Sequence, residues 1–245
     1  MNIVNKVLVS GLVGVSLAVG ASSVFAKGGR WSTITDTEPT TTSTEPTTTS
    51  TDDGLLDYNE QTHLFFMREE EKLARDVYLT LGKMYPNSAV FGKIDDSEQR
   101  HMDAVKAMIE KYGYEDPNTN DNVGVFTGEE YGQYFIVNYN ALVERASTSE
   151  LEALYVGAFI EELDMMDINQ CPHEIIDADN GIDYATECGN NYTDNSDITK
   201  LYDSLLDGSA NHLQGYVKNI EKIIGAGAYQ AQVLSQEEVD EILDR

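Results

Sequence analysis

Residues 94–105 read IDDSEQRHMDAV, and this stretch decides how the rest of the chain is interpreted. Apolar residues recur there and just beyond at helical spacing, at Ile94, Val105, Met108 and Tyr112. Glu98 and His101 fall on the same stripe, so the pattern predicts that both side chains point into the protein. A carboxylate and an imidazole are costly to bury without a partner, and a metal ion suits both. The alternative is a hydrogen-bonded polar pair inside a helical core.

The composition excludes some classes of partner. The 245 residues include 43 Asp and Glu against 16 Lys and Arg, which gives a formal net charge of −27. We do not expect so acidic a chain to bind nucleic acid or anionic lipid by charge. It is expected to attract cations. The length allows one or two domains.

The first 26 residues predict a signal peptide. Lys6 gives a short positive region, residues 7–24 are apolar with many small side chains, and Val24-Phe25-Ala26 has small residues at the −3 and −1 positions of a cleavage site. We therefore expect cleavage after Ala26 and export to the periplasm, to the exterior or to the cell surface, with no stable membrane insertion afterwards. The alternative is an uncleaved anchor, because the apolar run is nearly long enough to span a bilayer.

Residues 27–54 are expected to form a disordered tether between the signal peptide and a folded domain. They are rich in Thr, Ser, Glu and Pro, and the sequence TEPTTTS occurs at 37–43 and again at 44–50. Such a composition cannot build a hydrophobic core. We expect the folded part to be a single helical domain over residues 55–245.

The two cysteines, Cys171 and Cys188, are expected to form a disulfide. An even cysteine count in an exported chain favours this pairing, which would close an insertion rich in Asp, Asn and Gly. Free thiols or soft metal ligands are the alternatives. The acidic residues inside the insertion fail the EF-hand pattern, because Cys188 falls at its twelfth position. Weak Ca²⁺ binding by this loop or by residues 116–122 stays open.

Helical periodicity dominates the folded part, and alternating strand patterns are almost absent. Asp57 with Glu60, and Ser235 with Glu238, predict capping boxes at the first and last helices, and Ser149 is a predicted cap for the fourth. The expected fold is all-α: a four-helix bundle with one extra short helix and the disulfide-closed insertion. The predicted helices span residues 57–85, 88–112, 129–145, 150–168 and 196–224, followed by a short terminal helix from Ser235.

Each of the four long helices places at least one Glu, Asp or His residue, the types that bind metal ions, on its apolar face. Bundles that hold two iron or manganese ions use a Glu from each of two helices and Glu-x-x-His from each of the other two. Here Ser209 stands where the last Glu is expected. Glu162 competes with Glu161 for the inner position, and helical phase favours Glu161. The candidate ligands are Glu71, Glu98, His101, Glu161, Asp164 and His212.

These motifs resemble a known superfamily. Residues 71–78 (EKLARDVY) resemble the first-helix ligand motif of rubrerythrins, and residues 97–101 (SEQRH) resemble their second-helix Glu-x-x-His. The whole pattern is most similar to an uncharacterised branch of the ferritin-like superfamily, a domain of unknown function found in bacteria and archaea. The matching stretches are residues 68–78, 91–102, 156–168 and 208–213.

The resemblance implies a ferritin-like bundle with a metal site, and Ser209 departs from it. Either Asp164 compensates for the missing Glu, or the site holds one metal ion, or the site is structural. The candidate ligands have alternative roles: Asp164 as a surface residue and His212 as a core histidine. Tyr78 is expected in the core, and His63 and His173 on the surface.

The predicted function is that of an exported metal-binding protein, with iron or manganese as the expected metal and Zn²⁺ also suited to the ligands. Glu98 and Glu161 are expected to bridge, while Glu71, His101 and His212 would be terminal ligands. A redox-active site would oxidise Fe²⁺ or reduce O₂ or peroxide. No catalytic residue is assigned, and whether the protein is an enzyme or forms a homo-oligomer stays open. The alternative function is a non-enzymatic, metal-stabilised surface or binding module.

Overall fold

The computed structural model describes residues 55–88 and 90–245, and it describes only the backbone of Asp95. The predicted signal peptide (1–26) and tether (27–54) lie outside these residues. Over the described ranges the chain is all-α, as predicted, with no β-strand. None of the described helices is long and apolar enough to cross a membrane. The elements are α1 (Tyr58–Met84), α2 (Phe91–Lys111), α3 (Gly132–Ala146), α4 (Glu150–Asn169), α5 (His173–Ile176), the 3-10 helix η2 (Ala185–Glu187), α6 (Ser196–Ile224) and α7 (Gln236–Ile242).

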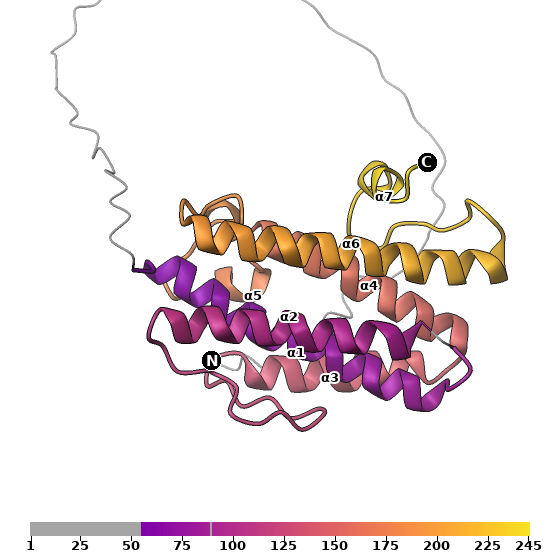
Figure 1. Ribbon diagram of the computed structural model, residues 1–245, viewed down its shortest axis with the longest axis horizontal. Coiled ribbons are helices and arrows are strands. Elements are labelled where there is room, and N and C mark those ends of the chain that lie inside the picture. The colour runs from indigo at the N-terminus through magenta and orange to yellow at the C-terminus, as the bar shows by residue number, and fades with distance from the viewer. Residues whose placement is uncertain (1–54, 89) are drawn as a thin grey trace, which may run out of the picture.

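The long helices pack lengthwise in two pairs. α1 lies along α2, and α4 lies along α6, as Figure 1 shows. α3 packs against both α1 and α4 and so joins the two pairs on one side. Beyond α6, the chain folds back and ends in the short helix α7. The four helices that carry the candidate ligands are therefore brought together.

The helix ends follow the predicted capping signals. Asp57 and Glu60 form a capping box at α1, and Ser235 and Glu238 form another at α7. The Ser149 side chain accepts the Glu152 amide at the start of α4. These bonds satisfy backbone N–H groups that the first helical turn leaves without partners. α6 spans the predicted range, and the Asn195 side chain caps it by accepting a hydrogen bond from the Asp197 amide.

Two structural predictions were wrong in detail. The predicted helices at 129–145 and from Ser235 are present as α3 and α7, but the described residues contain one more helix, α5, that was not predicted. α5 consists of four residues inside the disulfide-closed insertion and is too short to show helical periodicity. His63, predicted on the surface, is fully buried between the Tyr202 hydroxyl (2.7 Å) and the Asp167 carbonyl (2.8 Å).

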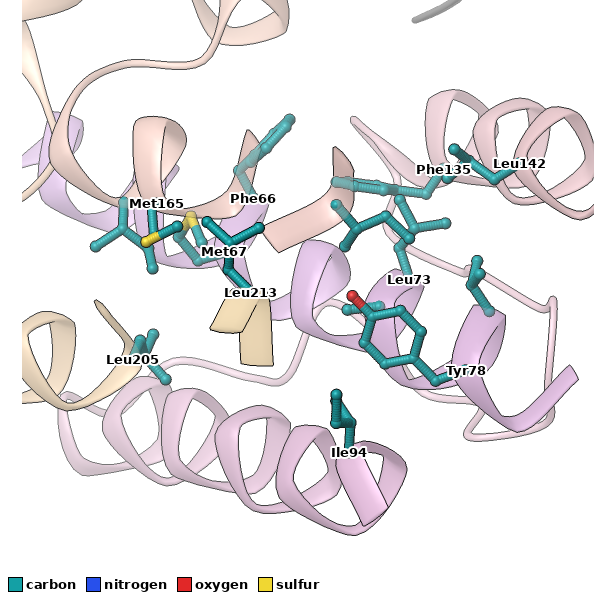
Figure 2. Close-up of a cluster of buried hydrophobic side chains, with 14 of the residues drawn as sticks. Phe66, Met67, Leu73, Tyr78, Ile94, Phe135, Leu142, Met165, Leu205 and Leu213 are labelled. Carbon is teal, nitrogen blue, oxygen red and sulfur yellow. The ribbon is translucent and has the colours of Figure 1, made fainter. Parts of the chain in front are cut away.

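The hydrophobic core surrounds a polar middle. Figure 2 shows buried side chains from several helices, including Phe66, Leu73 and Phe135. Each ligand-bearing helix has buried apolar residues before and after its polar positions, for example Ile94 and Val105 in α2. This apolar surround excludes water from the polar residues and fixes the helices that carry them. The corresponding residues are Met67 and Val77 in α1, Ala158 and Ile168 in α4, and Leu205 and Tyr216 in α6.

The predicted disulfide is formed between Cys171 and Cys188. It closes the insertion that contains α5 and η2, and the Cys171 amide donates to the Ala185 carbonyl within it. α5 also contacts α1. The insertion is thus held against α1.

Candidate metal centre

Three candidate ligands meet between α1 and α2. His101 Nδ1 lies 3.1 Å from Glu98 Oε2 and 3.4 Å from Glu71 Oε2. The ligand atoms of Glu71, Glu98 and His101 all lie within 4.8 Å of one another. Glu98 and His101 meet because residues three apart on a helix share a face, whereas Glu71 is brought in by the packing of α1 on α2.

A second group forms on the other side of Glu98. His212 Nδ1 of α6 lies 2.6 Å from Glu98 Oε1 and 3.4 Å from Glu161 Oε2 of α4. The ligand atoms of Glu98, Glu161 and His212 also lie within 4.8 Å of one another. The two groups therefore share Glu98, whose two oxygens face different histidines.

The contact between His212 and Glu98 is close but does not have hydrogen-bond geometry. His212 Nδ1 and Glu98 Oε1 are 2.6 Å apart, yet both atoms are buried without a hydrogen-bond partner, as is Glu71 Oε1. Buried polar atoms in proteins are normally paired. Donor atoms that lie close together without pointing at one another are the arrangement expected of ligands that converge on one ion, so the residues fit a metal ion.

Without a metal ion, the positive charge in these two groups comes from the two histidines. Burial opposes charging of both histidines, but the neighbouring carboxylates outweigh it and raise the pKa of His101 to about 11 and that of His212 to about 10. Burial would raise the pKa of Glu98, but the two histidines lower it to about 2. Burial raises the pKa of Glu71 and Glu161 to about 7. Protonated imidazoles thus balance the carboxylates where a metal ion would otherwise do so.

Asp164 is buried beside the two groups but joins neither of them. The Ser209 hydroxyl donates to Asp164 Oδ2 at 2.5 Å, while Asp164 Oδ1 is buried without a hydrogen-bond partner. The structure therefore brings five of the six predicted ligands into the two groups. The sixth is held next to them by the residue that replaces the expected Glu.

Two further residues support the candidate ligands. The Tyr78 hydroxyl donates to Glu161 Oε1 at 2.6 Å, and Figure 2 shows this hydroxyl directed into the interior. A Cβ atom on Gly208 would lie 2.4 Å from His101 Nε2, so the His101 ring occupies space that only glycine leaves open. A glycine inside a helical pattern was the one sequence signal of this close approach.

Glu161 and Glu162 point to different surroundings. The Glu162 carboxylate is fully buried and accepts hydrogen bonds from the Tyr229 hydroxyl and from backbone amides of the segment after α6. The donating amides belong to Gln232, Val233 and Leu234. Glu162 therefore anchors the C-terminal segment, while Glu161 faces the candidate metal centre.

Comparisons with known proteins place the chain in a family. Residues 60–245 match the family described as an uncharacterized protein domain (DUF2202), and this range contains all six candidate ligands. The chain belongs to the DUF2202 family. It is similar to the uncharacterized protein MJ0754 of Methanocaldococcus jannaschii, with 41% identity over 184 residues that cover 75% of this chain and 86% of the relative.

The fold of this DUF2202 protein is also similar to a solved structure. The crystal structure of the hypothetical protein MJ0754 matches it with a TM-score of 0.63 and 39% sequence identity. The match covers 78% of this chain and 94% of the solved chain. The family match agrees with the predicted resemblance to a domain of unknown function.

The DUF2202 domain also buries acidic residues that the sequence did not single out. The run Glu69-Glu70-Glu71, typical of a solvated helix face, is buried throughout, and so is Asp167. Burial raises the pKa of both Glu70 and Asp167, and nearby carboxyl groups raise it further: Asp167 and Asp164 act on Glu70, and Glu174 and Asp164 act on Asp167. No local pattern predicts this, because α1 is covered by α2, α3 and α4 together.

Proposed function

We propose that this protein is an exported metal-binding protein with a ferritin-like four-helix bundle, whose core holds iron or manganese. Glu71 and His101 would hold one position, Glu161 and His212 a second, and Glu98 would bridge them. The sharing of Glu98 by two carboxylate–histidine groups is the observation that carries this proposal. Carboxylate and imidazole ligands suit Fe and Mn, and they also suit Zn²⁺.

Asp164 is the residue that would compensate for Ser209. Its free oxygen is buried next to Glu71 and His101, and burial, together with the nearby Glu71 carboxyl group, raises its pKa. The Ser209 hydroxyl orients the other oxygen. We therefore assign Asp164 as an additional donor at the position of Glu71 and His101.

A bound iron or manganese ion would supply redox chemistry. The reaction would be either the reduction of O₂ or peroxide, or the oxidation of Fe²⁺ as a substrate. The protein's own residues would hold the ligands in place and manage protons. Tyr78 orients Glu161, and His101 and His212 must each release a proton from Nδ1 before that nitrogen can donate to a metal. The apolar layers around the centre keep bulk water away from it.

A second candidate function is a non-enzymatic, metal-stabilised module on the cell surface or in the periplasm. The substitution of Ser209 for the expected Glu favours it, because one standard ligand is lost. We do not extend this candidate to Ca²⁺ at residues 116–122. There the side-chain oxygens of Asp116, Asn118 and Asn120 already accept hydrogen bonds from backbone amides. Asp116 also forms an ion pair with Arg68.

Metal analysis of the mature protein tests the proposal. We expect the purified protein to retain a transition metal and expect His101→Ala and Glu161→Ala to lose it. His173→Ala is the matched control, because His173 is exposed and belongs to neither group. Metal content that stays unchanged in His101→Ala, or that is absent from the parent after exposure to Fe²⁺ and Mn²⁺, would contradict the proposal. Full occupancy without O₂ or peroxide consumption would favour the second candidate.

A further inference from the structure

A row of buried carboxyl groups leads away from the candidate metal centre along α4. Glu161, Asp164 and Asp167 are three residues apart, so they share one face of the helix with steps of about 4.5 Å along its axis. Their exposed fractions are only 2%, 4% and 4%. Glu161 belongs to the centre, Asp164 lies beside it, and Asp167 lies one step further out.

Residues from two other helices extend this row to the surface. Glu70 of α1 is buried, and its carboxyl group is close enough to that of Asp167 for each to shift the pKa of the other. Glu174 of α5 interacts with Asp167 and with the Tyr134 hydroxyl, and it is half-buried. We call Glu174, Asp167, Glu70 and Asp164 the carboxyl row. Its outer end is at the surface and its inner end is next to Glu71.

The basic groups that act on the carboxyl row are histidines, His173 near Glu174 and His101 near Asp164. Among the ion pairs of residues 55–88 and 90–245, no Lys or Arg side chain pairs with a member of the row. The basic residues of α1 pair with other acids, as Arg68 does with Asp116 and Lys72 with Asp76. Ionisable groups are costly to bury without a counter-charge, so this interior favours an incoming cation.

Two atoms of the row are open to a ligand. Glu70 Oε2 and Asp164 Oδ1 are buried and have no hydrogen-bond partner. Both residues are only 4% exposed, so neither oxygen is compensated by bulk water. Hard divalent cations prefer oxygen ligands of this kind. The row therefore offers successive oxygen positions between the surface and the centre.

The disulfide-closed insertion gives the row its outer end. Glu174 lies in α5, which starts two residues after Cys171 and contacts α1. The link between Cys171 and Cys188 holds this segment in place. The side chains of His101 and His212 are 12% and 10% exposed, so the part of the centre nearest the solvent presents imidazole rings rather than carboxylates.

We propose that the carboxyl row is the route by which divalent metal cations enter the centre, with Glu174 at its mouth. This inference rests on the proposed metal-binding function. A cation would pass from Glu174 to Asp167 and Glu70, then to Asp164, and reach Glu71 without leaving oxygen ligands. The acidic surface of the protein would raise the local cation concentration at the mouth.

Loading kinetics test this route. Metal-free protein is mixed with Co²⁺ in a stopped-flow instrument, and the ligand-field absorption of the bound ion is followed at fixed ionic strength. We expect Glu174→Gln and Asp167→Asn to slow loading by roughly tenfold or more, since charge focusing in clefts changes association rates by about 10- to 1,000-fold. Final amplitude and affinity should stay within about twofold of the parent. Glu237→Gln, an exposed residue of α7, changes the net charge equally and is the matched control.

Three outcomes would overturn the route. If both variants load at the rate of the Glu237→Gln control, cations enter elsewhere, and the metal centre itself is unaffected. If either variant lowers the final absorption of bound Co²⁺, that residue is a ligand of the centre and not a residue that cations only pass. If the parent binds no Co²⁺, the proposed metal centre fails and the route fails with it. Glu174→Gln keeps the test valid if the buried Asp167→Asn does not fold, because Glu174 is only half-buried.

Discussion

At the scale of single residues, Glu98 is the side chain on which the candidate centre depends. Its two oxygens face His101 and His212, and these contacts lower its pKa to about 2 while both histidines become more basic. A single carboxylate therefore links α2 to the ligands of three other helices. Sequence periodicity located Glu98 on the buried face, and both Glu98 and Glu161 were expected to bridge; of these two residues, only Glu98 belongs to both groups.

Glu98→Gln should abolish this sharing. The amide keeps the size of the side chain but cannot bridge two cations as a carboxylate does, so we expect metal content to fall to one ion or fewer per chain. The pKa of both histidines should fall in the metal-free variant, because a negative charge has been removed. Elemental analysis and histidine NMR titration measure the two effects. Unchanged metal content with unchanged histidine pKa values would contradict the assignment.

Alanine substitutions at two glycines of α6 should have different effects, one on the stability of the protein and the other on metal affinity. Gly215→Ala should stabilise the protein by about 0.5–1 kcal/mol through helix propensity, because the nearest side-chain atoms would lie 3.8–4.0 Å from the new Cβ. In Gly208→Ala the new Cβ would lie 2.4 Å from the His101 ring, so the ring must move and metal affinity should fall. Urea unfolding and metal titration of both variants check this. Equal metal affinities would contradict the packing argument.

At the scale of elements, neighbouring residues of α4 serve different parts of the molecule. Glu161 contributes to the centre, and Glu162 binds the segment that returns from α6. The Glu162 carboxylate accepts four hydrogen bonds from this segment, one from Tyr229 and three from backbone amides. The position of the C-terminal segment thus depends on one buried charge.

Glu162→Gln should destabilise the protein without changing its metal content. The charge-assisted bonds become neutral ones, and at least one buried donor loses its acceptor because the amide has only one oxygen, which costs roughly 2–4 kcal/mol of unfolding free energy. Glu152→Gln, which weakens a partly exposed pair with Arg145, should cost less than about 1 kcal/mol. Urea denaturation and elemental analysis provide both readouts. A loss of metal in Glu162→Gln comparable to that in Glu161→Gln would show that the two residues are not separated as described.

At the scale of the whole molecule, the buried acidic groups make the stability of the metal-free protein depend on pH. Burial raises the pKa of Glu71 and Glu161 from 4.5 to about 7, so their contribution is most favourable below pH 4.5 and is lost as the pH rises to 7. The raised pKa values of His101 and His212 stabilise the fold below pH 6.5, and this contribution is lost as the pH rises toward 10–11. Glu98 acts oppositely, but only as the pH falls from 4.5 toward 2.

The metal-free protein should therefore melt at a higher temperature at pH 5 than at pH 8. Metal binding requires deprotonated ligands, so added Mn²⁺ should stabilise the protein more at pH 8 than at pH 5. Thermal unfolding with chelator and with Mn²⁺ at both pH values measures this. A metal-free protein with the same melting temperature at pH 5 and pH 8 would contradict the pKa shifts of the buried carboxyl groups.

The sequence by itself determined the four long helices, α3 and α7, several of their caps, and the helix faces that carry the candidate ligands. These features arise from local periodicity and from hydrogen bonds within one helical turn, so Asp57, Glu98 and Glu161 could be placed from spacing alone. Only the tertiary structure decided which oxygen of Glu98 meets which histidine, that Ser209 holds Asp164, and that His63 is buried. Except for the pair of Glu98 and His101 within α2, these contacts join side chains that are tens to more than a hundred residues apart. Their distances depend on how the helices pack, and no local pattern in the chain encodes that packing.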